Sequence, residues 1–267
     1  MRRILTVAAL VLCIGACQKG PADDDPSKPD TTAAQTQAHA GLQDVIERTP
    51  QYLVGITFPP VANQHPLLAK ALKVYADRAR ADLTQAVNAA GSAAKANLPY
   101  DLSLNFTDIS QRNDAIVIAA DGSLYTGGAH GIPLIARFTY LPAEQRLLQP
   151  SDLVKDEGWK AVSDYVRSQL SDAIKTRLEE DEIPSGERPE ILESANAMIE
   201  EGTLPDAANF AQFEPIPSAD GKWFGLRFVF PPYQVGPYSD GTQTVDVPVE
   251  VLRPYLTDAY RARFTGG

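Results

Sequence analysis

Two segments of the sequence combine residue types that could do chemistry. The first, Tyr125–Gly131, reads YTGGAHG and surrounds His130 with glycines. Glycine permits positive φ, so the N–H groups of such a loop can face an anion, and histidine can act there as a base or a ligand. The alternative is a wide connection between two strands, in which His130 makes one fixed hydrogen bond. Because no strand-to-helix glycine motif surrounds His130, we expect a connection between strands and not a catalytic loop. A role of the loop in recognition remains an alternative.

The second segment, Phe230–Gly241, reads FPPYQVGPYSDG. Its prolines fix the backbone, and Tyr233 and Tyr238 offer large amphipathic contact surfaces suited to a protein or a glycan. The alternative is that these rings cover the end of a sheet and its core. Both interpretations can hold at once, with one tyrosine buried and the other exposed. The candidate binding residues are therefore Tyr125, His130, Tyr233 and Tyr238.

Other chemistries find little support in the residue types. A zinc site needs three or four ligands, and the part expected to fold offers His65 and His130 without cysteine. No Gly-x-Ser-x-Gly motif is present, and the acidic runs at 23–25, 179–182 and 200–201 are typical of solvated surfaces. We expect no metal, no cofactor and no enzymatic activity; a weak hydrolase centred on His130 is the third alternative.

The N-terminus has the pattern of a targeting signal. Two arginines precede an apolar run over 4–14, and small residues then lead to Cys17. This order is typical of a secretory signal peptide, and its end resembles the bacterial lipobox. Residues 1–17 are therefore predicted to be a lipoprotein signal peptide, with Cys17 lipidated; the alternative is an ordinary signal peptide with an incidental cysteine. Gln18, in place of aspartate, favours the outer membrane.

Composition narrows the classes of partner. The 267 residues contain 24 Lys and Arg against 34 Asp and Glu, a net charge of −10. Loss of the two arginines with the signal peptide would leave 22 against 34, or −12. Such a charge disfavours nucleic acid and charge-driven adhesion to anionic lipid. The apolar run at the N-terminus is too short to span a bilayer, so we expect the membrane to be reached through a lipid anchor.

The remaining chain divides by composition into three parts. Residues 18–41 are polar and proline-rich, which predicts a disordered tether. Residues 42–148 are predicted to form an N-terminal α+β domain and residues 149–267 a C-terminal one, built from antiparallel sheets with packed helices. Asp121–Gly122 indicates a turn. Helical spacing covers 66–95, 159–180, 189–201 and 250–260, and strand patterns cover 52–58, 100–106, 115–119, 134–140, 210–216, 223–230 and 244–249.

The two aromatic segments, with the helix Leu153–Ile174 between them and Val245–Pro248 after them, resemble a known region. They are similar to the extracytoplasmic region of RsiV-like anti-sigma factors, which sense lysozyme. There, an N-terminal domain of the type found in the deacetylase PdaC precedes an RsiV-like C-terminal domain of unknown function. The resemblance covers about residues 50–258 and depends on the order of Pro, Tyr, Gly and Tyr in the second segment.

The resemblance implies a binding module rather than a regulator or an enzyme. No cytoplasmic sigma-binding segment and no deacetylase catalytic domain can be recognised in the sequence, so neither activity is expected. What carries over is a non-catalytic cell-envelope lipoprotein, in the outer membrane and facing the periplasm, that binds a basic lysozyme-type muramidase and inhibits or senses it. The alternative is a module that binds peptidoglycan or another envelope glycan through the same tyrosines.

Overall fold

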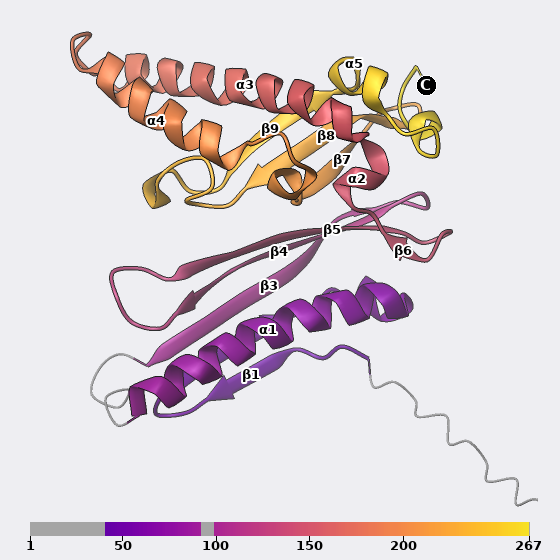
Figure 1. The fold of residues 1–267 in the computed structure, drawn as a ribbon. Helices are drawn as coiled ribbons and strands as arrows, with labels where there is room; N and C mark the ends of the chain where they lie inside the picture. Colours follow the sequence, from indigo (N-terminus) through magenta and orange to yellow (C-terminus); the bar gives the residue numbers. More distant parts are fainter. Residues whose placement is uncertain (1–40, 92–98, 267) are drawn as a thin grey trace, which may run out of the picture. The chain divides into compact units, whose positions relative to one another are not determined.

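The structure is a computed structural model that describes residues 41–91 and 99–266 (Figure 1). Residues Ala40–Gly267 cluster into one compact unit. The predicted signal peptide, the lipidated Cys17 and, apart from Gly41, the predicted tether lie outside the described residues. Within the described ranges, no helix combines the length and the apolar character needed to cross a membrane.

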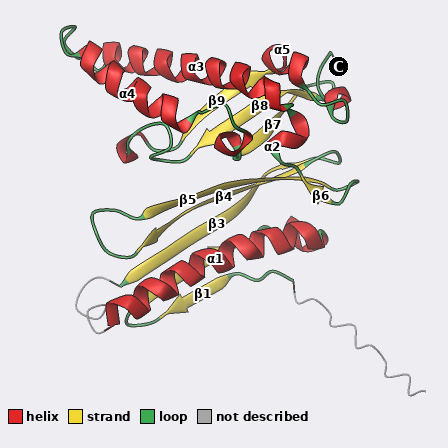
Figure 2. Ribbon diagram, in the orientation of Figure 1, coloured by secondary structure: helices red, strands yellow, loops and turns green. Residues whose placement is uncertain are grey.

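The α+β prediction is confirmed, with one sheet in each half of the chain (Figure 2). The first sheet has six strands in sequence order; its strands pair antiparallel except β2 and β3, which are parallel and are connected through the helix α1. The strands are β1 (Val45–Arg48), β2 (Tyr52–Thr57), β3 (Tyr100–Gln111), β4 (Ile116–Tyr125), β5 (Ile132–Leu141) and β6 (Arg146–Leu147).

Helix α1 (Pro66–Ala90) covers one face of this sheet. Its buried residues recur every three or four positions, which places them on one stripe of the helix; they are Leu68, Leu72, Ala76, Ala79, Leu83 and Val87. Pro66 suits the first helical position because its missing N–H has no partner there. The helix ends at Ala90, where Gly91 takes a φ of 52°, and residues 92–95 of the predicted helix lie outside the described residues.

The turn predicted at Asp121–Gly122 is wrong, because both residues lie inside β4. Gly122 is there for close packing: a Cβ at this position would lie 2.1 Å from the Ser103 carbonyl oxygen of β3. The chain turns later, where Gly127 and Gly128 have φ of 98° and 103°. The β4–β5 hairpin is therefore longer than predicted and carries His130 in its connecting loop.

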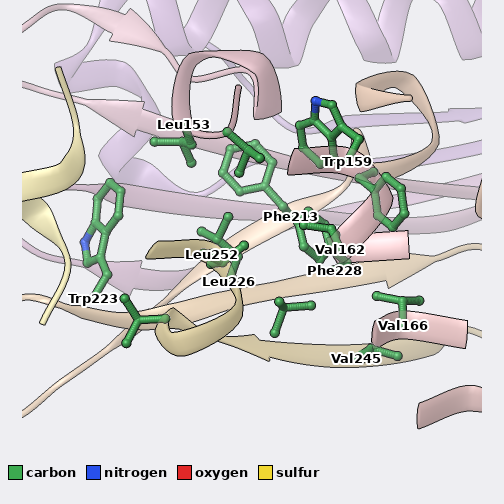
Figure 3. Packing of buried hydrophobic residues seen from close by; sticks show 14 of the residues in the cluster. Leu153, Trp159, Val162, Val166, Phe213, Trp223, Leu226, Phe228, Val245 and Leu252 are labelled. Carbon is green, nitrogen blue, oxygen red and sulfur yellow. The ribbon is translucent and has the colours of Figure 1, made fainter. Parts of the chain in front are cut away.

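The second sheet packs against α3 (Trp159–Glu180), whose predicted bounds are confirmed. Figure 3 shows Trp159, Val162 and Val166 of the helix beside Phe228 and Val245 of the sheet. The strand order is β7-β8-β9, all antiparallel. These elements are β7 (Phe213–Pro217), β8 (Trp223–Phe230) and β9 (Gln243–Pro248), with α2 (Pro150–Leu153) and α4 (Arg188–Gly202) also in this half.

Two further predictions in this half are corrected. The helix expected over 250–260 is only α5 (Val249–Leu252), followed by a 3₁₀ turn at Arg253–Tyr255. Pro254 has no N–H to donate and its ring disfavours a continuing helix, which explains the early end. The strand expected from 210 begins at Phe213, since residues 207–210 form a 3₁₀ turn capped by the Asp206 carboxylate.

Hydrogen bonds join the two halves of the described chain. The Arg137 backbone N–H of β5 donates to Gln212 Oε1 at 2.7 Å, and the buried Thr139 hydroxyl donates to the Phe213 carbonyl of β7 at 3.3 Å. Trp223 Nε1 donates to Asp114 Oδ2 at 3.0 Å. The predicted boundary at 148/149 falls between β6 and α2, and its separation of two domains stays a prediction.

Candidate binding surface

Three of the four candidate residues meet, although they come from two loops. His130 lies in the β4–β5 loop, and Tyr233 and Tyr238 lie in the β8–β9 connection. A 2.9 Å hydrogen bond joins His130 Nε2 to the Tyr233 hydroxyl, across 103 positions of sequence. The His130 and Tyr238 rings stack with centroids 4.0 Å apart and planes 10° apart, and the two tyrosine rings lie 5.7 Å apart. We call His130, Tyr233 and Tyr238 the aromatic cluster.

The fourth candidate, Tyr125, plays a different part. It is the last residue of β4, and its hydroxyl donates to the Gly128 carbonyl at 3.3 Å. This bond spans the two glycines with positive φ and ties the loop back to its own strand. Tyr125 therefore helps to hold the conformation of the loop that carries His130, and no contact with the aromatic cluster is recorded for it.

Hydrogen bonds and buried contacts hold the loop that carries the tyrosines against the fold. Gln234 Nε2 donates to the Gly202 carbonyl at 3.0 Å and to the Asn209 carbonyl at 2.8 Å. Val235, the next residue, is buried in the core under the second sheet. Because Gln234 and Val235 point into the fold, the flanking tyrosines are held near its surface without needing to be ordered by a ligand.

An ion pair and a hydrogen bond at Asp240 hold the end of the loop next to Tyr238. Tyr238–Asp240 form a 3₁₀ turn. Asp240 Oδ2 forms an ion pair with Arg177 Nη2 of α3 at 3.2 Å. Gln243, which begins β9, donates to the Asp240 carbonyl at 2.6 Å. The turn that carries Tyr238 is thus held by both the helix and the strand that border it.

Tyr233 has a backbone conformation that is costly for its residue type. Its φ is 74°, in the left-handed region that disfavours residues with a Cβ, and its side chain remains 53% exposed. A large apolar ring exposed on a strained backbone contributes little to the core. Such strain clusters at functional positions, where the rest of the structure offsets it.

The contacts of His130 are with tyrosine side chains. His130 contacts two aromatic rings, and no serine, cysteine or carboxylate within the described part of the chain hydrogen-bonds to it. Across residues 41–91 and 99–266, no three His, Cys, Asp or Glu side chains gather as a metal site requires. What the cluster presents is a tyrosine hydroxyl, ring edges and apolar ring surface.

Two exposed apolar residues lie close in sequence to residues that contact the cluster or its supporting loop. Ile132, two residues after His130, is 57% exposed, and Leu204, two residues after Gly202, is 53% exposed. Each belongs to a segment that contacts the cluster or its supporting loop. An isolated apolar residue beside a loop gives no signal in a sequence, so the exposure of these two is known only from the fold.

Comparisons with known proteins identify the C-terminal part of the chain by family. Residues 151–250 match a family described as "Protein of unknown function (DUF3298)", so a DUF3298 domain occupies this range. It includes the loop of Tyr233 and Tyr238 and excludes His130. No curated protein matches the chain.

Two solved structures are similar over most of the chain. A DUF3298 family protein from Pseudomonas aeruginosa PAO1 is 17% identical, with a TM-score of 0.53; the match covers 84% of this chain and 96% of that one. A DUF3298 member from Bacteroides fragilis NCTC 9343 is 14% identical over the same shares, with a TM-score of 0.48. At this identity, the first likeness shows a shared fold, and the description of that protein names no ligand.

Proposed function

We propose that this chain is a non-catalytic binding module of the cell envelope, and that the aromatic cluster contacts a protein partner. One observation carries the proposal: a histidine and two tyrosines from loops about a hundred residues apart meet at the surface, with Tyr233 strained and half exposed. Tyrosine is frequent among the residues that contribute most to protein interfaces. A loop that is already held in one conformation also loses little conformational entropy on binding.

A basic, lysozyme-type muramidase is the partner that we propose. The resemblance to the RsiV-like region supports this choice, and so does the charge of −10 over the whole chain. An acidic module attracts a basic partner over distance and speeds their encounter, and salt weakens that attraction. Binding would then cover part of the muramidase and either inhibit it or report its presence.

The alternative ligand for the cluster, a glycan, fits its geometry less well. Sugars stack against open ring faces, whereas His130 and Tyr238 cover one face of each other at 4.0 Å. The Tyr238 ring is only partly exposed, and among the tyrosines of the cluster Tyr233 offers the exposed ring. The third alternative, a hydrolase, would need a nucleophile or an activated water beside His130, and the recorded partners of His130 are tyrosines.

The N-terminal segments complete the proposal. Lipidation of Cys17 would anchor the chain in a membrane, in our proposal the outer membrane facing the periplasm. Residues 18–41, as a coil of about 24 residues, would span about 25–30 Å. The aromatic cluster would then reach partners that do not touch the membrane.

The test uses the chain from Gln18 onward, which retains every described residue and lacks the lipidated cysteine. It is titrated with a basic lysozyme by calorimetry, at low and at physiological salt. We expect saturable binding that weakens with salt and falls about tenfold or more in Tyr233→Ala and in Tyr238→Ala. The matched control is Phe224→Ala, since Phe224 is also aromatic and is 48% exposed, but lies near the opposite end of β8.

Two results would contradict the proposal. Absence of binding at both salt concentrations would remove the muramidase as the partner. Equal losses in Phe224→Ala and Tyr233→Ala would show that binding does not depend on the aromatic cluster.

A further inference from the structure

A groove between the two sheets forms a second candidate site, away from the aromatic cluster. Its volume is about 630 Å³, within the roughly 300–1,000 Å³ of ordinary ligand sites. β3, β4 and β5 line one wall, and β7, β8 and β9 line the other. Six strands from both halves of the chain therefore shape it, and none of His130, Tyr233 and Tyr238 lines it.

The two arginines that line the groove are both paired with carboxylates. The Arg137 side chain is only 10% exposed; its Nε lies 2.7 Å from Glu214 Oε1, and its Nη1 lies 3.1 Å from Asp121 Oδ1. On the opposite wall, Arg227 makes a two-pronged ion pair with Asp246, at 2.6 and 2.8 Å. Both guanidinium groups of the lining are thus already paired with carboxylates, and one of those carboxylates, Glu214, itself lines the groove.

The rest of the lining is small, hydroxylated or apolar. Ser110 and Thr244 bring hydroxyl groups, and no hydrogen bond to another described residue is recorded for either side chain. Ile109 is 45% exposed. The remaining apolar lining consists of Val117, Pro215, Ile216 and Pro217. The groove thus combines hydroxyl groups with apolar surface.

We infer that this groove binds a short segment of an uncharged oligosaccharide. A sugar presents hydroxyl groups, which the paired charges, Ser110 and Thr244 can bind, and C–H faces, which can pack on Ile109 and the prolines. The inference concerns a different site from the aromatic cluster and does not depend on whether that cluster binds a muramidase.

Other classes of ligand match the groove less well. An anion would meet the Glu214 carboxylate, and both guanidinium groups of the lining are already paired with carboxylates. A wholly apolar chain would displace water from the ion pairs without replacing its hydrogen bonds. A peptide adding to the edge of β7 would lack two backbone donors, because Pro215 and Pro217 have no N–H.

The experiment uses the chain from Gln18 and a tetramer of β-linked N-acetylglucosamine, followed by calorimetry and by amide chemical shifts. Its deacetylated, cationic form and a galacturonate tetramer, which is anionic, run in parallel. We expect saturable binding of the neutral tetramer, unchanged by salt because the ligand carries no charge. The affinity should fall about fivefold in Thr244→Val, the size of one lost hydrogen bond, and binding should disappear in Ser110→Trp, which fills the groove.

Matched controls separate this site from the fold and from the aromatic cluster. Thr176→Val removes an exposed hydroxyl from α3, whose hydrogen bond stays within the helix, and should leave binding unchanged. Tyr233→Ala should also leave it unchanged. The inference fails if no neutral tetramer binds at millimolar concentration, if a charged tetramer binds more tightly, or if Thr244→Val and Ser110→Trp bind as the unaltered chain does.

Discussion

At the scale of single residues, two substitutions of Tyr233 distinguish the cost of its strained backbone from the contribution of its side-chain contacts. Tyr233→Ala and Tyr233→Gly both remove the ring and its hydrogen bond to His130, but only glycine relieves a φ of 74°. We expect Tyr233→Gly to be more stable than Tyr233→Ala by about 1 kcal/mol. The left-handed region costs a residue with a Cβ about 1–2 kcal/mol, and glycine avoids this cost. The greater conformational freedom of glycine in the unfolded chain offsets part of the difference. Urea denaturation measures the difference; equal stabilities would show that no strain is stored there.

Glu144 provides a prediction of pH dependence. Burial alone would raise the pKa of its carboxyl group, but hydrogen bonds from Tyr260 and Arg263, with the charges of Arg263 and Arg146, outweigh burial and hold the pKa below its usual value. A lowered pKa in the folded state stabilises the fold above the unfolded pKa of about 4.5. That contribution disappears as the pH falls through the folded pKa.

The matching experiment compares Glu144→Gln with the unaltered chain by urea denaturation at pH 7 and pH 3. We expect the variant to be less stable at pH 7, because glutamine cannot replace the charged interaction with Arg263. The difference between the two proteins should be smaller at pH 3, because the carboxylate takes up a proton as the pH falls through its folded pKa. A difference that stays constant with pH would contradict the assignment.

The residues of the candidate site could be predicted from their types, but not from their spacing. Prolines and tyrosines in a short segment, and a histidine among glycines, are enough to indicate His130, Tyr233 and Tyr238 in the sequence. Their contact with each other could not be predicted, because it depends on how the two sheets come together. The groove was missed entirely, since residues such as Arg137 and Thr244 look like ordinary strand residues along the chain.

At the scale of elements, the end of α4 supports the tyrosine loop and can be tested without touching an aromatic ring. A Cβ on Gly202 would lie 1.8 Å from the Gln234 carbonyl oxygen and 2.6 Å from its carbon, both backbone atoms. Gly202→Ala must therefore displace the loop, and we expect a loss of about 1–3 kcal/mol in stability together with weaker binding at the cluster.

Gly186, just before the same helix, is the matched control. Nothing lies within 4 Å of a Cβ built there. Gly186→Ala should change stability by less than about 1 kcal/mol and leave binding unaltered. Denaturation curves and lysozyme titrations of the two variants decide the point; if both alanines behave alike, the loop is not held in place by its approach to Gly202.

Elements with strong local patterns were predictable, and those set by tertiary contacts were not. The bounds of α3 and β8 follow from helical spacing and from a continuous apolar run. Asp121–Gly122 carries the local signature of a turn, yet the close approach of β3 keeps it in a strand. The predicted helix over 250–260 failed for the opposite reason, because a local breaker, Pro254, outweighs the helical spacing around it.

At the scale of the whole molecule, the contacts between the halves predict that they unfold together. Thr139 and Arg137 of the first half bond to Phe213 and Gln212 of the second. Leu141 and Leu148 of the first half also belong to the core under the second sheet. Separating the halves would expose these leucines and leave a buried hydroxyl without its partner, which costs free energy on both sides.

The two tryptophans make this measurable. Trp159 and Trp223 both lie in the second half, so fluorescence follows that half, whereas far-ultraviolet circular dichroism also follows α1 and the first sheet. We expect the two probes to give the same urea midpoint. Thr139→Val, which removes the buried bond to Phe213, should lower both midpoints together by about 1 kcal/mol of stability. Separate transitions, with only one of them shifted by Thr139→Val, would mean that the groove lies between two bodies that are free to move. Coincident transitions would mean that the walls of the groove are held at a fixed spacing before any ligand binds.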